Sequence, residues 1–196
     1  MKVKRTSVQT ERLVLAAALT AVVVILQIMA ILTRAVLPLF AINLVLIPIV
    51  IGAAIGGVGV GAWLGFISGV AIIISGDAAA FLAISIFGTL ITVLLKGTAS
   101  GFAAAGVYKA FEKKNRYLAV LMSAIVCPIV NTGIFVLGCL VFFMDTVRMW
   151  GAGLGYDNAF AYIFLGMIGI NFIIEMVLNV LLSPMVVRLL RIQEKK

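Results

Sequence analysis

The chain has 196 residues, of which 64% are hydrophobic and 11% are charged, and its formal net charge is +8. Soluble domains carry about 25% charged residues, so a chain of this length cannot bury so much apolar surface within itself and needs lipid as its solvent. It contains no histidine, and its basic residues stand in short clusters between apolar stretches, so we expect no enzyme, no metal or cofactor site and no nucleic-acid partner.

Apolar stretches in chain order predict an all-α membrane protein with six transmembrane helices in a single domain. The first has the roughly 20 residues needed to cross the hydrocarbon core, and the second is short for a span. Three connections are expected at one side of the membrane: the broken stretch 33–43, the tight turn 76–80, and residues 144–159, the longest polar connection. The expected helices lie at about 12–32, 44–55, 59–75, 81–108, 117–143 and 160–190.

The basic residues predict how the chain crosses the membrane. Six spans place both termini on one side, and that side then carries twelve Lys and Arg residues, whereas the other carries only Arg34 and Arg148. By the positive-inside rule, both termini are expected to be cytoplasmic. The twelve are Lys2, Lys4, Arg5, Arg12, Lys109, Lys113, Lys114, Arg116, Arg188, Arg191, Lys195 and Lys196.

The stretch "GVGVGAWLGFISG", residues 57–69, has two interpretations. A phosphate-binding loop would need a preceding strand and a following Lys-Ser or Lys-Thr, and neither is present. Glycine at every fourth position instead predicts a helix face that a neighbour can approach closely, either inside the bundle or at a surface that slides against a partner subunit. The glycines are Gly57, Gly61, Gly65 and Gly69, and Gly97, Gly101 and Ala105 form a similar stripe on the fourth helix.

Two ionisable residues lie within predicted spans. Lys96 and Glu175 each lie fifteen residues from the outer end of their helix, or about 22 Å deep. Their equal depth and opposite charge predict that they pair, and a direct role in ligand binding is the alternative.

Two asparagines form a second polar layer about 17 Å deep, Asn131 on the fifth helix and Asn171 on the sixth. Pro128, three residues before Asn131, can free the backbone carbonyl of Ala124, which favours a kinked helix beside a polar cavity. Asparagine also serves as simple interhelical glue in membranes, so both interpretations remain open. Residues expected at the cavity mouth are Gln27, Asn43 and Trp63, and those expected in a covering outer loop are Trp150, Tyr156 and Asn158.

A ligand that carries a carboxylate would also need a cation. Arg34 and Arg148 are the only basic residues on the predicted outer side, so one of them is expected to close over such a ligand. Lys96 is the deeper alternative.

Nearly the whole chain resembles the substrate-binding S component of an energy-coupling factor (ECF) transporter. The first helix contains "LAAALTA", in which Ala17 and Ala21 are similar to the small-residue motif that contacts the transmembrane coupling subunit. The resemblance implies a bacterial cell-membrane protein that binds a water-soluble vitamin from outside and works with one coupling subunit and two ATPase subunits. The other stretches that carry it are "INLVLIPIVIGAAIGGVGVGAWLGFISG", "VLLKGTASGFAAAGVYKAF", "VCPIVNTGIFVLGCLVFF" and "GINFIIEMVLNVLLSP".

The polar residues are most similar to those of pantothenate-type S components, namely Lys96, Asn131 with Thr132, and Asn171 with Glu175. Riboflavin-type members carry a lysine where this chain has Ile174, and nickel and cobalt members use an N-terminal histidine that is missing here. The alternatives are an S component for another vitamin or metabolite (riboflavin, folate or a pyrimidine precursor), or a small membrane scaffold or channel-like oligomer without a soluble ligand.

Overall fold

The structure is a computed structural model that describes residues 2–36 and 44–194, without the side chains of residues 2–9, 11, 33–36, 193 and 194. All regular elements in these residues are helices. They are α1 (Lys2–Val36), α2 (Leu46–Gly56), α3 (Val58–Ile74), α4 (Ala79–Leu82), α5 (Ile86–Phe111), α6 (Arg116–Phe142), α7 (Met144–Gly153), α8 (Ala159–Ala161), the π-helix η1 (Tyr162–Ile168) and α9 (Gly169–Glu194).

Within the described residues, four helical segments are long and apolar enough to cross a membrane: Arg12–Leu32, Ile86–Phe111, Arg116–Phe142 and Ala159–Ile192. The remaining apolar helices, α2 and α3, have only 11 and 17 residues. At 1.5 Å per residue, α2 is about 16 Å long, roughly half the thickness of the hydrocarbon core. The prediction of an all-helical chain is confirmed for the described residues, and the count of six transmembrane helices stays a prediction.

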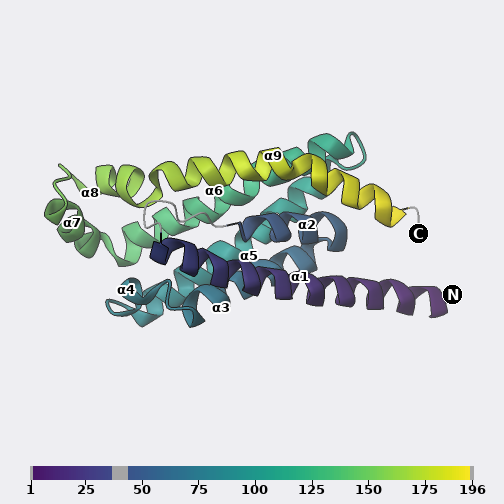
Figure 1. The fold of residues 1–196 in the computed structure, drawn as a ribbon, viewed down its shortest axis with the longest axis horizontal. Helices are drawn as coiled ribbons and strands as arrows, with labels where there is room; N and C mark the ends of the chain where they lie inside the picture. The colour runs from purple at the N-terminus through teal and green to yellow at the C-terminus, as the bar shows by residue number, and fades with distance from the viewer. Residues whose placement is uncertain (1, 37–43, 195–196) are drawn as a thin grey trace.

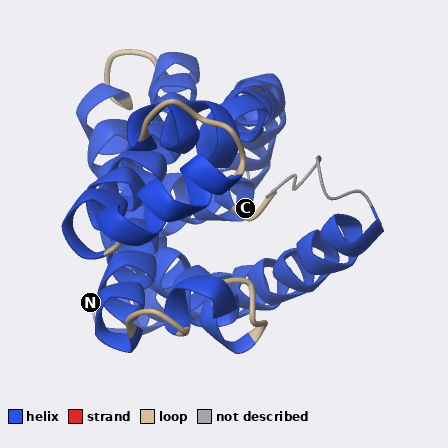
Figure 2. Cartoon of the chain, turned by 90° about the vertical axis from the view of Figure 1, so that its left-hand side faces the viewer, coloured by secondary structure: helices blue, strands red, loops and turns tan. Residues whose placement is uncertain are grey.

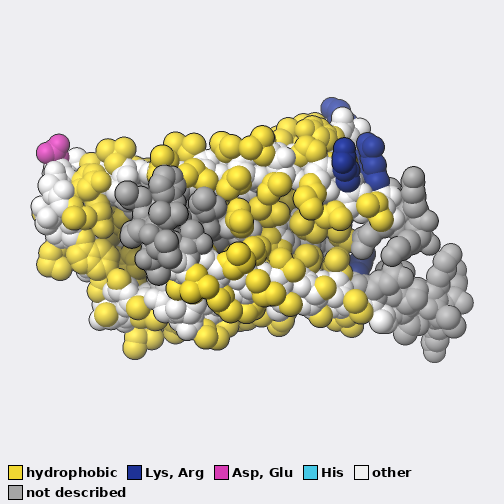
Figure 3. All heavy atoms as spheres, in the orientation of Figure 1, with side chains coloured by type: hydrophobic (Ala, Val, Ile, Leu, Met, Phe, Trp, Pro, Cys, Tyr) yellow, Lys and Arg dark blue, Asp and Glu magenta, His cyan; other side chains and the backbone are white. Residues whose placement is uncertain are grey.

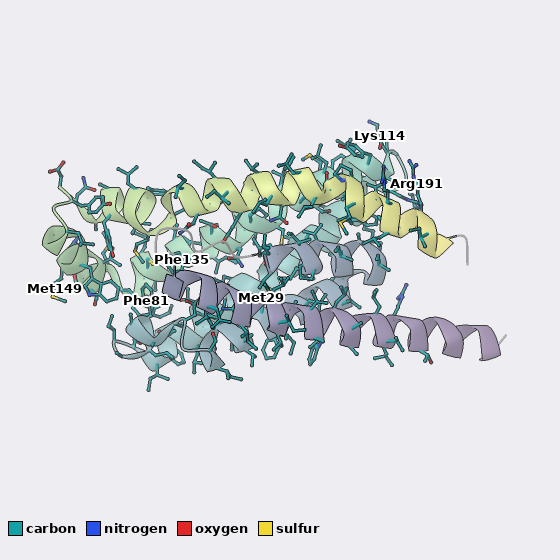
Figure 4. All side chains as sticks on the ribbon, viewed as in Figure 1. Met29, Phe81, Lys114, Phe135, Met149 and Arg191 are labelled. Atoms are coloured by element: carbon teal, nitrogen blue, oxygen red, sulfur yellow. The ribbon has the colours of Figure 1, made fainter. Side chains whose placement is uncertain are left out.

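The helices form an elongated bundle in which the N- and C-terminal ends of the described chain lie at the same end (Figure 1). The turn between α5 and α6 lies at this end too, and Lys114 and Arg191 mark it in Figure 4. Lys and Arg side chains gather there in the space-filling view, and hydrophobic side chains cover most of the length of the bundle (Figure 3). We call this the basic end. The helices α4, α7 and α8 lie at the opposite end, and Figure 2 views the bundle from there.

Glycine allows α3 and α5 to pack with their backbones in contact. A Cβ atom added to Gly65 would run into the backbone of Gly97, and one added to Gly61 would lie 2.7 Å from the carbonyl oxygen of Gly101. The prediction of tight packing inside the bundle is confirmed for Gly61, Gly65 and Gly69. Gly57 does not belong to this stripe, because it forms the turn between α2 and α3 with a φ of 79°.

One predicted helix start was wrong because a capping residue sets it, and the start of the next helix agrees with the prediction to within one residue. The fourth long helix begins at Ile86 instead of residue 81, since the side chain of Ser85 accepts a hydrogen bond from the amide of Gly88 at 3.1 Å. Residues 79–82 form the separate short helix α4. The next helix begins at Arg116, where the side chain of Asn115 accepts from the amide of Leu118.

The outer connections also differ from the prediction. Residues 144–153, expected as a loop, form helix α7. Helix α1 continues to Val36, three residues into the predicted loop 33–43, and the rest of that loop lies outside the described residues. The predicted helix 160–190 is interrupted, because Gly169 adopts φ 28° and ψ −128° at the end of η1.

Candidate functional site

A cavity of about 390 Å³ lies between α5, α6, η1 and α9, and the turn before α4 contributes to its wall. This volume is at the small end of the range of about 300–1,000 Å³ for ligand pockets. Five of the predicted site residues line it: Lys96, Asn131, Thr132, Asn171 and Glu175. Their shared location places both predicted polar layers in one cavity.

Lys96 projects from α5 toward an aromatic wall. Its Nζ atom lies 5.3 Å from the centre of the Phe135 ring, within the range of a cation–π interaction. Because α5 begins at Ile86, Lys96 lies ten residues, or about 15 Å, from the start of its helix, and the predicted depth of 22 Å was wrong. Lys96 and Glu175 both line the cavity, and their pairing stays a prediction.

Asn171 has a polar atom without a hydrogen-bond partner in the described part of the chain. Its Oδ1 atom is buried and has no hydrogen-bond partner among the described residues. Asn179, two turns further along α9, differs, because its Nδ2 atom donates to the carbonyl oxygen of Glu175 at 2.8 Å. Buried polar atoms are almost always hydrogen-bonded, so an unpaired acceptor in a cavity wall is suited to a ligand that donates a hydrogen bond.

The break in the last long helix shapes this side of the cavity. The π-helix η1 supplies Tyr162 and the segment 166–168 to the wall, and α9 then supplies Asn171 and Glu175. Short π-helical segments often occur at functional sites. Irregular backbone at membrane depth is tolerated where it lines a cavity.

An aromatic cluster lies beside the cavity, near the end of the bundle opposite the basic end. Phe81 of α4 packs against Phe135, Phe143 and Trp150, with ring centres 5.9, 5.0 and 5.5 Å apart. Figure 4 shows Phe81 and Phe135 near one another, with Met149 of α7 further toward that end. The cluster therefore fixes α4 and α7 against α6 beside the cavity.

Asp77 is a further acidic residue in the cavity wall. Gln27 of α1, only 1% exposed, donates from Nε2 to Asp77 Oδ2 at 3.4 Å. Gln27 does not line the cavity itself and acts on it through Asp77.

Residues 11–187 match the family described as "ECF transporter, substrate-specific component". The chain belongs to this family. Comparisons with curated proteins and with solved structures gave no match.

The family establishes the general role of this S component. It is a substrate-binding transport subunit and a multi-pass membrane protein, and not an enzyme. Its family works with ECF membrane and ATPase subunits and with a small-molecule substrate. The resemblance stated from the sequence is thus confirmed at the level of the family.

Several predicted residues of the S component lie away from this cavity. Trp63 lines a different cavity and donates from Nε1 to Thr20 Oγ1 at 3.1 Å. Arg148 does not line the site either; its guanidinium lies 3.7 Å from the carboxylate of Asp145, and both side chains are exposed. The Arg34 side chain and all of Asn43 lie outside the described residues.

Two residues of the predicted covering loop help to position η1 in the S component. The side chain of Asn158 accepts a hydrogen bond from the amide of Ala161 at 2.8 Å and so caps the helix that leads into η1. The ring of Tyr156 packs 5.3 Å from that of Tyr162.

Sequence reasoning missed Asp77 and the aromatic wall of the S component. Asp77 stands alone as an acid in the turn 76–80, and that isolation in an otherwise apolar connection was an available signal. The wall residues Phe81, Phe135, Tyr162 and Phe172 carried no such signal, since aromatic residues are equally common on lipid-facing surfaces.

Proposed function

We propose that this S component binds a small water-soluble vitamin, with pantothenate as the best candidate, in the cavity between α5, α6 and α9. The unpaired Oδ1 atom of Asn171 in the same wall as Lys96 carries the proposal. A ligand with a carboxylate and several hydrogen-bonding groups fits this combination. Riboflavin, folate and pyrimidine precursors are the competitors that a binding experiment must include.

Each polar group of the cavity has a complementary group on such a ligand. The ammonium of Lys96 suits a carboxylate, and the amides of Asn131 and Asn171 can each donate to and accept from amide and hydroxyl groups. The carboxylates of Asp77 and Glu175 accept hydrogen bonds from hydroxyl groups. The aromatic wall then excludes water from the apolar part of the ligand.

The proposed direction of binding follows from the charge distribution. The basic end of the bundle is assigned to the cytoplasm of a bacterial cell by the positive-inside rule. The aromatic cluster and α7 then lie on the external side of the cavity. The ligand enters from outside, and α7 forms part of the cover.

We expect Asn131→Ala and Asn171→Ala each to weaken binding of the true ligand by about ten- to a hundredfold. Loss of a hydrogen bond to a charged or strongly polar ligand group costs about 1.5–3 kcal/mol. Calorimetric titration of pantothenate, riboflavin, folate and a pyrimidine precursor into the purified chain measures this.

Asn115→Ala is the matched control for these variants, because that side chain caps α6 and does not line the cavity. Its affinity should equal that of the parent. If Asn131→Ala and Asn171→Ala also bind as tightly as the parent, the pocket lies elsewhere and both residues serve only to hold helices together.

We further propose that α1 contacts the coupling subunit through Ala17 and Ala21, within a complex that includes two ATPase subunits. Both alanines are exposed on the described surface of α1. Small residues on an exposed helix face permit the close backbone approach by which membrane helices associate.

Replacement of Ala17 by Trp is expected to abolish assembly with the coupling subunit and leave vitamin binding unchanged. The bulky ring would hold α1 away from the coupling subunit. Vitamin binding should not change, because Ala17 does not line the ligand cavity. Co-purification of the complex and calorimetry of the isolated chain measure the two effects. Ala152→Trp, at an exposed position of α7, is the control; normal assembly and transport by Ala17→Trp would show that this face is misassigned.

A further inference from the structure

A second cavity, of about 820 Å³, opens at the basic end of the bundle. It lies between the start of the apolar part of α1, the turn between α2 and α3, and the last turns of α5. Its lining includes Arg12, Leu13, Gly59, Trp63, Tyr108 and Lys109. None of these residues lines the proposed vitamin cavity, and we call this second cavity the basal groove.

The basal groove has charged side chains at its rim and apolar side chains deeper inside. Arg12 is the first residue of a candidate membrane span, and Lys109 lies in the last turn of another, so both cations stand where the hydrocarbon core meets the headgroups. Leu13, 70% exposed, and Trp63, 48% exposed, supply apolar surface deeper in the groove. This order of charge and apolar surface matches a phospholipid, whose phosphate lies above its acyl chains.

The charges at the rim favour an anion. Arg12 and Lys109 take part in no ion pair within the described part of the chain. Glu112 also lines the groove, so its three charged side chains sum to one positive charge. Two cations available to one phosphate group favour an anionic lipid over one with no net charge.

Trp63 fixes the apolar wall in place. Its Nε1 atom donates to Thr20 Oγ1 at 3.1 Å, which ties α3 to α1 across the groove and holds the indole ring against the lipid-facing surface. Tryptophan is enriched at membrane interfaces because its ring is apolar and its N–H is polar. Here the N–H is satisfied by the protein, and the ring remains as a surface for an acyl chain.

Glycine keeps the groove open. A Cβ atom added to Gly57 or Gly59 would meet no described atom within 4 Å, so no described residue fills the space directly beside either glycine. Gly57 needs its positive φ, but Gly59 lies within the regular helix α3 and accepts a side chain without strain. A larger residue at Gly59 would therefore fill the groove and leave its charges intact.

We propose that the basal groove binds one anionic phospholipid, with its phosphate between Arg12 and Lys109 and an acyl chain along Leu13 and Trp63. The bound lipid fills the space between α1 and the turn of α2 and α3 at the cytoplasmic surface. This role is independent of which vitamin the protein carries.

Native mass spectrometry of the full chain in detergent, titrated with phosphatidylglycerol or with phosphatidylcholine of identical acyl chains, tests the proposal. The parent should retain one phosphatidylglycerol in preference to phosphatidylcholine. A cation near a membrane surface contributes about 1 kcal/mol, so Arg12→Gln and Lys109→Gln should each weaken phosphatidylglycerol binding about fivefold and together about thirtyfold. Lys113→Gln with Lys114→Gln, which removes two cations outside the groove, should change nothing.

Gly59→Leu should abolish retention of the lipid, whereas Gly106→Leu should not. Gly106 is the matched control, because a Cβ there also meets no atom within 4 Å but the residue does not line the groove. Circular dichroism during heating confirms that both variants fold. Equal retention of the two lipids by the parent, or unchanged phosphatidylglycerol binding by Gly59→Leu, overturns the proposal. A Gly59→Leu variant that keeps the lipid and loses the coupling subunit shows that the groove holds a protein helix instead.

Discussion

A Gly65→Leu variant is expected to lose the folded bundle or to unfold at a much lower temperature than the parent. A side chain at Gly65 would run into the carbonyl group of Gly97. Overpacking against movable side chains costs about 1–3 kcal/mol, and a backbone within a packed helix moves less easily, so we expect a loss of more than about 3 kcal/mol. Thermal unfolding and size-exclusion chromatography of the detergent-solubilised protein measure the effect.

Gly106→Leu provides the comparison for this variant. Both variants replace a helical glycine and so gain about 0.5–1 kcal/mol of helix propensity. At Gly106, however, an added Cβ meets no described atom within 4 Å. The difference between the two variants therefore isolates the contact between α3 and α5. A Gly65→Leu protein that melts within one or two degrees of the parent would show that these helices do not meet through their glycines.

Regular spacing made the close-packed face of α3 predictable from the sequence, but it did not show that α5 is the helix packed against it. Glycines four residues apart lie on one helix face whatever surrounds them, so Gly61, Gly65 and Gly69 could be assigned to one stripe. Gly57 has the same spacing but a different role, because its positive φ ends one helix before the next begins. Spacing alone does not distinguish a glycine needed for its size from one needed for its backbone angles.

The wrong helix boundaries had two different causes. Ser85 is an ordinary N-cap residue, as Asn115 is for α6, so the sequence does contain a signal for the start of α5. The break at Gly169 had no comparable signal, since glycine is common within membrane helices and most such glycines leave the helix intact.

The polar half of the cavity was more predictable than the apolar half. An amide or charge within a span is costly, so Lys96, Asn131 and Asn171 stood out in an apolar sequence. Aromatic residues have no such cost, and only the folded chain shows that Phe81 and Phe135 face the cavity and each other. The expected depth of Trp63 was wrong: it lies in the second turn of α3, close to the basic end, and not at the opposite end where the cavity mouth was expected.

The largest effect on stability in the ligand cavity is expected from separating Lys96 and Glu175. We expect Lys96→Met alone to destabilise the ligand-free protein by about 3 kcal/mol, the lower end of the range for breaking a buried pair, because both side chains are only partly buried. The loss would come mainly from the carboxylate of Glu175, left in the cavity without its cation. The double variant Lys96→Met with Glu175→Leu should recover much of this stability, because no charge of the pair then remains.

Thermal or denaturant unfolding of the parent, both single variants and the double variant gives a double-mutant cycle for this pair. Phe135→Leu is a necessary control, because the ammonium of Lys96 also lies over the Phe135 ring. Any Lys96 variant therefore also loses about 0.5–2 kcal/mol of cation–π interaction. An interaction energy well above this loss would assign the coupling to Glu175. Losses of unfolding free energy that simply add in the double variant would instead mean that Lys96 and Glu175 do not touch in the ligand-free protein. Each would then bind a different group of the ligand.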